Sequence, residues 1–464
     1  MAVIFWHRRD LRVHDNVGLY HARQRDPQVI PVFIFDPQIL KRPDTGAGRV
    51  QFMLDCLRVL DQRYRQLGSR LIVRFGDPVN ELVNLVQATQ AKAVLWNEDH
   101  EPFARHRDQR VEQALKHVGI PSVSSQDQLL HAPADVLTQA QQPYSVYGPF
   151  WRNWSSLPKG DPYPIPEPFH PPQVDSALIP TLADLTMTCA QSLPEAGEVV
   201  ALELLERFCQ QGIHNYGEQR NYPAQEGTSR LSPHLRFGTL GIRTLWQTTV
   251  DVDAEIRSEE AAQHLTTWRQ EIAWREFYKH ALHHWPRLET QPFRPIFTQM
   301  TWDQDKTRFE AWCRGETGYP IVDAAMRQLN QTGWMHNRCR MIVASFLTKD
   351  LLLDWRWGEQ YFMEQLVDGD LAANNGGWQW SASVGTDPKP LRIFNPSTQA
   401  ANYDPEAEYI RQYIPELSRL DPEDILSPRG LTPLQRRACG YPAPIVDHKV
   451  QQQEFKRRYQ ACRG

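Results

Sequence analysis

The chain has 464 residues, of which 41% are hydrophobic and 23% are charged, and its formal net charge is −4. This length favours two large domains over a single core. The small net charge excludes a protein coated in basic residues, although a local basic patch could still bind nucleic acid. The seven cysteines are scattered and form no C-x-x-C pair, which suits a reducing cytosol and offers no zinc site.

The sequence contains no segment typical of membrane insertion. Residues 1–10 have too short an apolar run for a signal peptide, and no stretch approaches the ~20 apolar residues of a membrane span. We therefore expect a cytoplasmic protein without a membrane partner, nucleoid-associated if it is bacterial. Nothing in the sequence requires an obligatory protein partner or more than a monomer.

Short apolar runs alternate with amphipathic segments over residues 1–130, which predicts an α/β domain with a doubly wound parallel sheet. Expected strands are 3–6, 29–35, 71–75 and 93–96, and expected helices are 51–67, 79–85 and 105–118. No G-x-G-x-x-G motif follows the first strand, so an ordinary dinucleotide site is unsupported there. Ligands still tend to bind at the carboxyl ends of such strands, where Asp36-Pro37 and Asn97-Glu98-Asp99 occur.

Residues 131–198 read as an interdomain linker, because prolines crowd residues 157–197 and rule out continuous regular structure there. Residues 199–464 then show an almost wholly helical pattern. We expect a larger all-α domain here, whose clearest helices are 201–211, 258–285, 321–331, 337–354 and 361–367.

Residues 368–380 form the most informative segment. Two acids (Asp368, Asp370), three amides and two indoles lie within it, together with a Gly-Gly pair. Acids and amides can bind a polar heterocycle, glycines let the backbone approach it closely, and indoles can stack or carry an electron. Arg340, near the start of another predicted helix, is a plausible ion-pair partner for one of the acids.

Two other segments carry polar groups with alternative interpretations. Ser232 is a natural N-cap with Pro233 at the first helical position, as in a plain helix N-terminus, yet such a start beside Arg230 also suits phosphate. Helical spacing places Glu271, Trp274, Arg275 and Tyr278 on one stripe, which could read a planar base or contain only an exposed Glu271–Arg275 salt bridge. Three nearby histidines lack a carboxylate partner, so we expect no metal site.

Taken together, these segments resemble the DNA photolyase/cryptochrome family from end to end. The motifs that carry the resemblance are residues 5–12, 228–232, 274–278, 318–320, 334–340, 368–380 and 392–396. The resemblance implies an FAD folded into a U shape in the helical domain. The residues implied to hold it are Tyr216, Thr228, Ser229, Arg230, Leu231, Ser232, Trp268, Glu271, Arg275, Asn337, Arg340, Asp368, Asp370 and Asn374, with Asp368 paired to Arg340 and Asn374 facing the flavin N5.

The resemblance also implies an activity. Asn374, together with an amide at Asn337 in place of the proton-donating histidine of (6-4) enzymes, favours a class I cyclobutane pyrimidine dimer photolyase. Catalytic contacts to the dimer would come from Glu271, Trp274, Asn337, Met341 and Trp380, and DNA contacts from Arg220, Arg338, Arg392 and Gln399. A blue-light cryptochrome photoreceptor and a DASH-type photolyase for single-stranded DNA are the alternatives.

Three further expectations follow from the same resemblance. Trp378, Trp355 and Trp302 would relay electrons between the flavin and the surface. Asp36, Pro37, Leu40, Arg49 and Asp99 would bind an antenna chromophore in the first domain, preferably the deazaflavin 8-HDF, with methenyltetrahydrofolate as the alternative. Ala400-Ala401-Asn402-Tyr403 stands where relatives often carry lysines, so we expect weaker and less salt-sensitive DNA binding.

Overall fold

A five-stranded parallel sheet forms the N-terminal part of the computed structural model, which describes residues 2–387 and 391–463. The strand order is β3-β2-β1-β4-β5. The strands are β1 Ala2–His7, β2 Gln28–Phe35, β3 Ile72–Phe75, β4 Val94–Asn97 and β5 Ser122–Ser125. The predicted α/β class and the first four strands are confirmed. The sequence pattern missed β5, because this edge strand reads Ser-Val-Ser-Ser and contains a single apolar residue.

Helices cover both faces of the sheet, which is why β1 to β4 are mainly apolar. Val3 and Phe5 of β1 pack in one hydrophobic cluster with the first helices of the chain, whereas Ile4 and Trp6 pack in a second cluster with the later ones. This alternation is the two-residue period of a strand. The helices are α1 Val17–Arg25, α3 Ala47–Gln66, α4 Pro78–Thr89 and α5 Pro102–His117, and the short α2 Pro37–Leu40 begins directly after β2.

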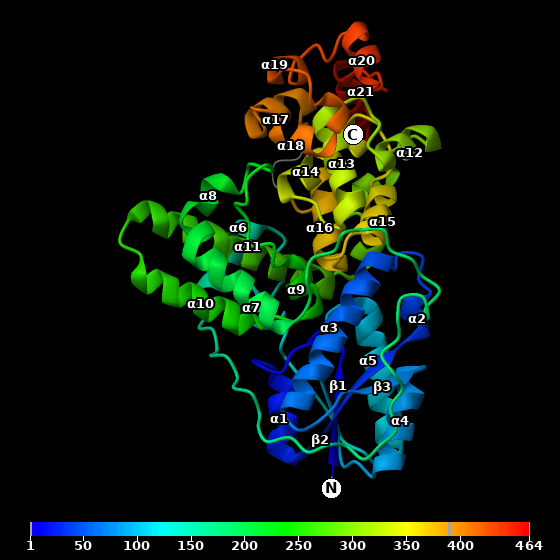
Figure 1. Cartoon of the computed structure of the whole chain (residues 1–464), viewed down its shortest axis with the longest axis vertical. Coiled ribbons are helices and arrows are strands. Elements are labelled where there is room, and N and C mark those ends of the chain that lie inside the picture. Colours follow the sequence, from blue (N-terminus) through cyan, green and yellow to red (C-terminus); the bar gives the residue numbers. More distant parts are fainter. Residues whose placement is uncertain (1, 388–390, 464) are drawn as a thin grey trace.

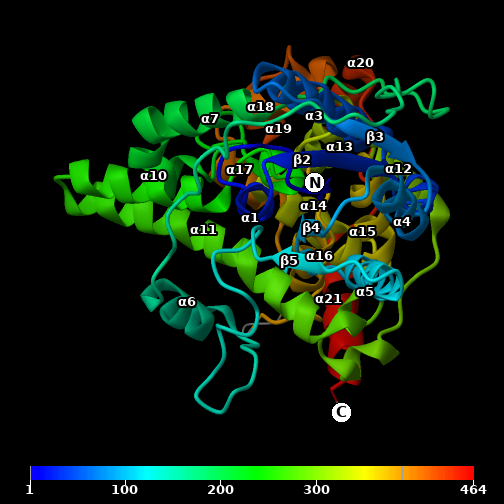
Figure 2. The ribbon, with the colours of Figure 1, turned by 90° about the horizontal axis from the view of Figure 1, so that it is seen from below.

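The segment at residues 157–197 contains no helix or strand and runs around the outside of the α/β domain (Figure 1). Phe169 and Leu182 anchor it in the sheet's hydrophobic cluster. The predicted linker also contains one helix that the sequence pattern missed, α6 Tyr147–Ser156. Phe150 and Trp154 of α6 are buried in a cluster of the helical domain, so α6 packs with that domain (Figure 2).

The rest of the chain is helical, as predicted. The helix expected at 361–367 begins earlier, at Trp355, because the Asp354 carboxylate caps the free N–H of Arg356. The helix expected at 337–354 ends at Lys349. The helices are α7 Glu198–Arg207, α8 Tyr216–Gln219, α9 Ser232–Phe237, α10 Ile242–Glu255, α11 Glu259–His284, α12 Lys306–Arg314, α13 Pro320–Thr332, α14 Asn337–Lys349, α15 Trp355–Gln365, α16 Leu371–Ser381, α17 Pro396–Tyr403, α18 Glu408–Tyr413, α19 Pro422–Ile425, α20 Pro433–Cys439 and α21 His448–Ala461.

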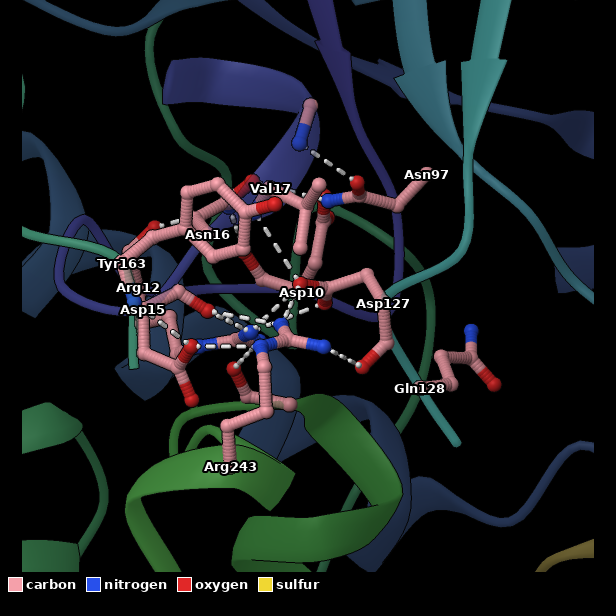
Figure 3. A network of polar contacts seen from close by, with 12 residues as sticks. Asp10, Arg12, Asp15, Asn16, Val17, Asn97, Asp127, Gln128, Tyr163 and Arg243 are labelled. Atoms are coloured by element: carbon pink, nitrogen blue, oxygen red, sulfur yellow. Dashed lines mark hydrogen bonds and ion pairs between the residues drawn. The ribbon is translucent and has the colours of Figure 1, made fainter. Parts of the chain in front are cut away.

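A buried ion network joins the two domains (Figure 3). Arg243 of α10 donates to Asp15 at 2.8 Å and to Asp127 at 2.7 Å, and Arg12 donates to Asp127 at 2.8 Å. Burial raises the pKa of Asp15, but Arg12 and Arg243 outweigh this effect and hold the pKa below its usual value. The network therefore fixes the helical domain on the loop that follows β1.

Replacing Arg243 by alanine is expected to lower the free energy of unfolding by about 3–5 kcal/mol, because it leaves the buried Asp15 carboxylate without its closest partner. Arg58→Ala provides the control, since it breaks an exposed pair with Asp55 and is expected to cost at most about 1 kcal/mol. Urea unfolding measures both variants. Equal losses in the two variants would contradict the prediction.

Candidate functional site

A cavity of about 390 Å³ lies between α11, α14 and α16. Twelve of the site residues predicted from the sequence line it, although they come from chain segments as far apart as Arg220 and Trp380. The predicted residues in its wall are Arg220, Glu271, Trp274, Arg275, Asn337, Arg340, Met341, Asp368, Asp370, Asn374, Trp378 and Trp380.

Helix α16 supplies one wall of the cavity. Asp370 caps the helix by accepting a hydrogen bond from the Ala373 N–H at 3.2 Å. From this start, the i, i+4 spacing places Asn374 and Trp378 on the cavity side. Gly376 lets α16 approach α11, because a Cβ at this position would lie 2.1 Å from the Tyr278 ring.

Asp368 and Arg340 form the predicted ion pair at the base of the cavity. Arg340 Nη2 donates to Asp368 Oδ2 at 2.8 Å. The second carboxylate oxygen, Asp368 Oδ1, is buried and has no hydrogen-bond partner among the described residues. A buried acceptor without a hydrogen-bond partner costs folding free energy. Asp368 Oδ1 therefore suits a ligand that donates a hydrogen bond at this position.

Asn374 is oriented by the backbone of α15. Its Nδ2 donates to the carbonyl oxygen of Glu359 at 2.9 Å. This bond leaves the Oδ1 of Asn374 as an acceptor in the cavity wall. The arrangement suits the expected acceptor role of Asn374 toward an N–H group.

Two aromatic side chains from different helices also line the cavity. Trp274 of α11 and Trp380 of α16 both line the cavity and are partly exposed. Tyr147 of α6 stacks on Trp274, with ring centroids 3.6 Å apart and planes 7° from parallel. The sequence pattern missed Tyr147, because it lies in the region predicted to be a linker.

Glu271 of α11 also lines the cavity, where it pairs with Arg220 at 2.8 Å. A helix salt bridge between Glu271 and Arg275, which the sequence left open, is therefore not formed. Arg275 instead donates to the carbonyl oxygen of Gln128, in the chain that follows β5, at 2.8 Å. A tertiary contact thus prevails over the local i+4 pairing.

Some predicted cofactor residues lie outside the cavity wall. Tyr216, Trp268 and Leu231 are buried together in the adjoining hydrophobic cluster, and Arg220 connects the two regions by lying 5.2 Å over the Tyr216 ring. The segment Thr228, Ser229, Arg230, Leu231 and Ser232 also lies outside the wall.

The expected N-cap at Ser232 is wrong, because Leu231 occupies the cap position and Ser232 is the first residue of α9. The Ser232 Oγ instead accepts a hydrogen bond from Trp334 Nε1 at 3.3 Å. Arg230, in the left-handed conformation at φ +50°, lies 5.1 Å over the Trp334 ring. Ser232 and Arg230 therefore both contact the indole of Trp334.

The three tryptophans of the predicted relay share one hydrophobic cluster. Trp378 and Trp355 are buried, and Trp302 is partly exposed. The ring of Trp378 lies 6.0 Å from the ring of Trp312, a fully buried indole that no sequence motif indicates. Trp312 is therefore packed against the cavity-lining indole of Trp378.

A second cavity, of about 160 Å³, opens at the carboxyl edge of the sheet. Asp36, Leu40, Arg49 and Asp99 line it, as predicted, and Pro37 begins α2 beside it. Arg49 is buried and donates to the carbonyl oxygens of Met363 and Asp44 at 2.6 and 2.5 Å, without a carboxylate partner among the described residues. Burial lowers the pKa of Arg49 to about 10.

No group of three or more metal-type side chains that could hold an ion occurs within residues 2–387 and 391–463. The histidines near the end of α11 have other partners: His280 and His284 contact the carbonyl oxygens of His131 and Pro133. In the same ranges, no helix is long and apolar enough to cross a membrane.

Comparison with known proteins identifies the family to which this chain belongs. Residues 3–172 match the family model described as DNA photolyase, and residues 268–461 match the model described as the FAD binding domain of DNA photolyase. The chain belongs to the DNA photolyase family. Asp370, Asn374 and Trp378, which line the large cavity, all lie within the FAD-binding match.

The most similar relatives cover nearly the whole chain. A deoxyribodipyrimidine photo-lyase from Synechococcus is 51% identical over 98% of this chain and 96% of its own. The crystal structure of a class III photolyase from Agrobacterium tumefaciens superposes with a TM-score of 0.91 at 36% identity, covering 100% of this chain and 98% of the other. A cryptochrome from Synechocystis superposes with a TM-score of 0.90 at 26% identity, covering 98% of each chain.

Proposed function

We propose that this chain is a deoxyribodipyrimidine photo-lyase that repairs cyclobutane pyrimidine dimers in DNA with light. The observation that carries the proposal is the composition of the large cavity. Its base presents hydrogen-bond acceptors suited to a flavin, and its open side presents two indoles beside a carboxylate. Such a cavity can hold a flavin and a planar pyrimidine pair together.

The residues at the base of the cavity fit FAD. Asp368 Oδ1 lacks a partner and Asn374 Oδ1 remains an acceptor, so both suit N–H groups of a reduced flavin ring. The cationic Arg340 beside Asp368 suits the more electron-rich side of the cofactor. When bound and reduced, FAD supplies the light-driven one-electron chemistry.

The open side of the cavity fits the dimer. Trp274 and Trp380 can stack on the pyrimidines, while Glu271, Asn337 and Met341 contact their edges. The lesion must leave the helix to reach these groups, as in other base-flipping enzymes, of which photolyases are a known example. A poorly stacked dimer costs less to extrude than an intact pair, and this difference favours damaged DNA.

The proposal is tested by reducing the purified, FAD-loaded protein and adding an oligonucleotide with one thymine dimer. Dimer loss is then followed under blue light and in a dark control. Repair in the light alone supports the photo-lyase. Absence of repair by a protein that binds both reduced flavin and the lesion would contradict it.

The second candidate is a blue-light photoreceptor, which the similarity to the Synechocystis cryptochrome favours. A photoreceptor would pass the flavin tests and fail the repair test. A preference for single-stranded over double-stranded lesions in the same assay would instead indicate the DASH-type alternative. Asn374 and the set Glu271, Trp274, Asn337 and Met341 around one cavity support the repair enzyme.

The second cavity suits an antenna chromophore, which we propose to be 8-HDF, with methenyltetrahydrofolate as the alternative. Phe33 and Leu40 contribute an apolar wall for a flat ring. Arg49 and Arg236 line the cavity without carboxylate partners among the described residues, and the Nη1 of Arg236 is buried without any partner. Such guanidinium groups suit an ionised hydroxyl on the ring, which the deazaflavin carries.

Introducing a lysine at Ala401 is expected to tighten DNA binding and to steepen its salt dependence. Ala401 and Asn402 are exposed on α17 and carry no charge. One added phosphate contact makes the slope of log K against log[salt] more negative by about 0.9. Binding titrations at several salt concentrations measure this slope, with Ala401→Gln as the uncharged control. An unchanged slope for Ala401→Lys would show that this surface does not face the DNA.

A further inference from the structure

Tyr222 and Tyr403 meet beside the large cavity, although they lie 181 positions apart in the chain. Their ring centroids are 6.5 Å apart and their planes are inclined by 67°, so the two rings form a corner. Both side chains are partly exposed, and neither hydroxyl has a hydrogen-bond partner among the described residues. Core packing alone does not explain why these two tyrosine rings, which contact each other, remain partly exposed to solvent.

Arg338 completes this corner. Its guanidinium lies 4.3 Å over the ring of Tyr403, and its Nη2 donates to Asn221 Oδ1 at 2.5 Å. Within the described residues it has no carboxylate partner, and its Nε is buried without an acceptor. The side chain is therefore held in place while its charge remains uncompensated, as a phosphate-binding arginine requires.

Two short segments of the chain connect this corner to the large cavity. Asn221 and Tyr222 directly follow Arg220, and Arg338 directly follows Asn337; Arg220 and Asn337 both line the cavity. Arg220 also lies close enough to lower the pKa of Arg338, an effect that adds to that of burial. A strand whose dimer occupies the cavity therefore passes over this corner.

We propose that Tyr222 and Tyr403 stack on the nucleotide that flanks the dimer in the damaged strand, beside Arg338, whose contact with DNA the family resemblance already implies. Aromatic rings bind an unstacked base without regard to its sequence, which suits a lesion that occurs in many sequences. Stacking also adds affinity without adding charge, on a surface where α17 presents Ala401 and Asn402. The inference rests on the proposed repair of DNA.

Tyr222→Ala is the deciding variant, because the contacts that hold Arg338 in place run to Tyr403 and Asn221 and not through the Tyr222 ring. Dark binding to a dimer-containing oligonucleotide is measured by fluorescence anisotropy at several salt concentrations. We expect Tyr222→Ala to weaken binding at least about five-fold with an unchanged salt slope. Arg338→Ala should make the slope shallower by about one phosphate contact. Tyr222→Phe, which keeps the ring, is the matched control and should bind like the parent.

Three results would overturn the inference. Tyr222→Ala could bind the dimer as tightly as the parent, or it could change the salt slope as Arg338→Ala does, which would show that the ring acts only by placing the arginine. If the parent protein itself did not prefer dimer-containing DNA, the proposed function would fail and this inference with it. The parent titration therefore separates the two failures.

Discussion

A variant with alanine in place of Asp370 is expected to lose about 3–5 kcal/mol of folding stability and to purify without flavin. Asp370 Oδ2 accepts from Arg9 of the α/β domain and from Lys279 of α11, the latter at 3.0 Å, while Oδ1 caps α16. Lys279 is 2% exposed and has no other ion-pair partner among the described residues. Alanine therefore deprives the buried Lys279 of this carboxylate and removes the cap of the helix that carries Asn374 and Trp378.

Asp370→Asn separates the two causes. Asparagine can still cap α16 through its side-chain oxygen, but it cannot neutralise Lys279. Because burial already lowers the pKa of Lys279 to about 8, the loss of the carboxylate should lower it further and leave the amine neutral at pH 7. We expect Asp370→Asn to lose less stability than Asp370→Ala and to retain part of its flavin. Thermal unfolding and flavin absorbance measure both effects, and two variants that behave like the parent would contradict this account.

The sequence predicted the architecture well where periodicity was strong. Buried parallel strands are continuous apolar runs, and four of the five were identified in this way. Strand β5 was missed because an edge strand needs few apolar residues, and α6 was missed because it is short and directly precedes the proline-rich segment. Both are held by tertiary packing, which a local pattern does not contain.

The site was predictable because its residues come in dense motifs. Asp368, Asp370, Asn374, Trp378 and Trp380 all belong to one short stretch of sequence, and all five line one cavity. The partner of each side chain was less predictable. Glu271 has Arg275 one helical turn away, yet it pairs with Arg220 from another segment.

The sequence did not predict the ring contacts between distant segments. Tyr147 stacks on Trp274 and Tyr403 lies under Arg338, and in neither pair does sequence spacing indicate the neighbour. These contacts shape the open side of the cavity. The recognition of the lesion is therefore the part of the function that most needed the structure.

Replacing Trp355 by phenylalanine is expected to abolish light-driven reduction of oxidised FAD while leaving repair by chemically reduced enzyme intact. Trp355 is buried in the same hydrophobic cluster as Trp378 and does not line the cavity, so its loss should leave the lesion site unchanged. Photoreduction is followed by the loss of flavin absorbance in the presence of an external reductant. Loss of repair in the chemically reduced variant would contradict a role limited to electron supply.

Two further variants decide the route of the electron. Trp312→Phe tests the indole whose ring lies 6.0 Å from that of Trp378, and Trp357→Phe provides a matched control in the same helix as Trp355. We expect both to photoreduce like the parent, because the predicted relay runs through Trp378, Trp355 and Trp302. If Trp312→Phe lost photoreduction while Trp355→Phe kept it, the electron would instead enter through Trp312. Burial and ring contact would then predict the route of the electron better than the family resemblance does.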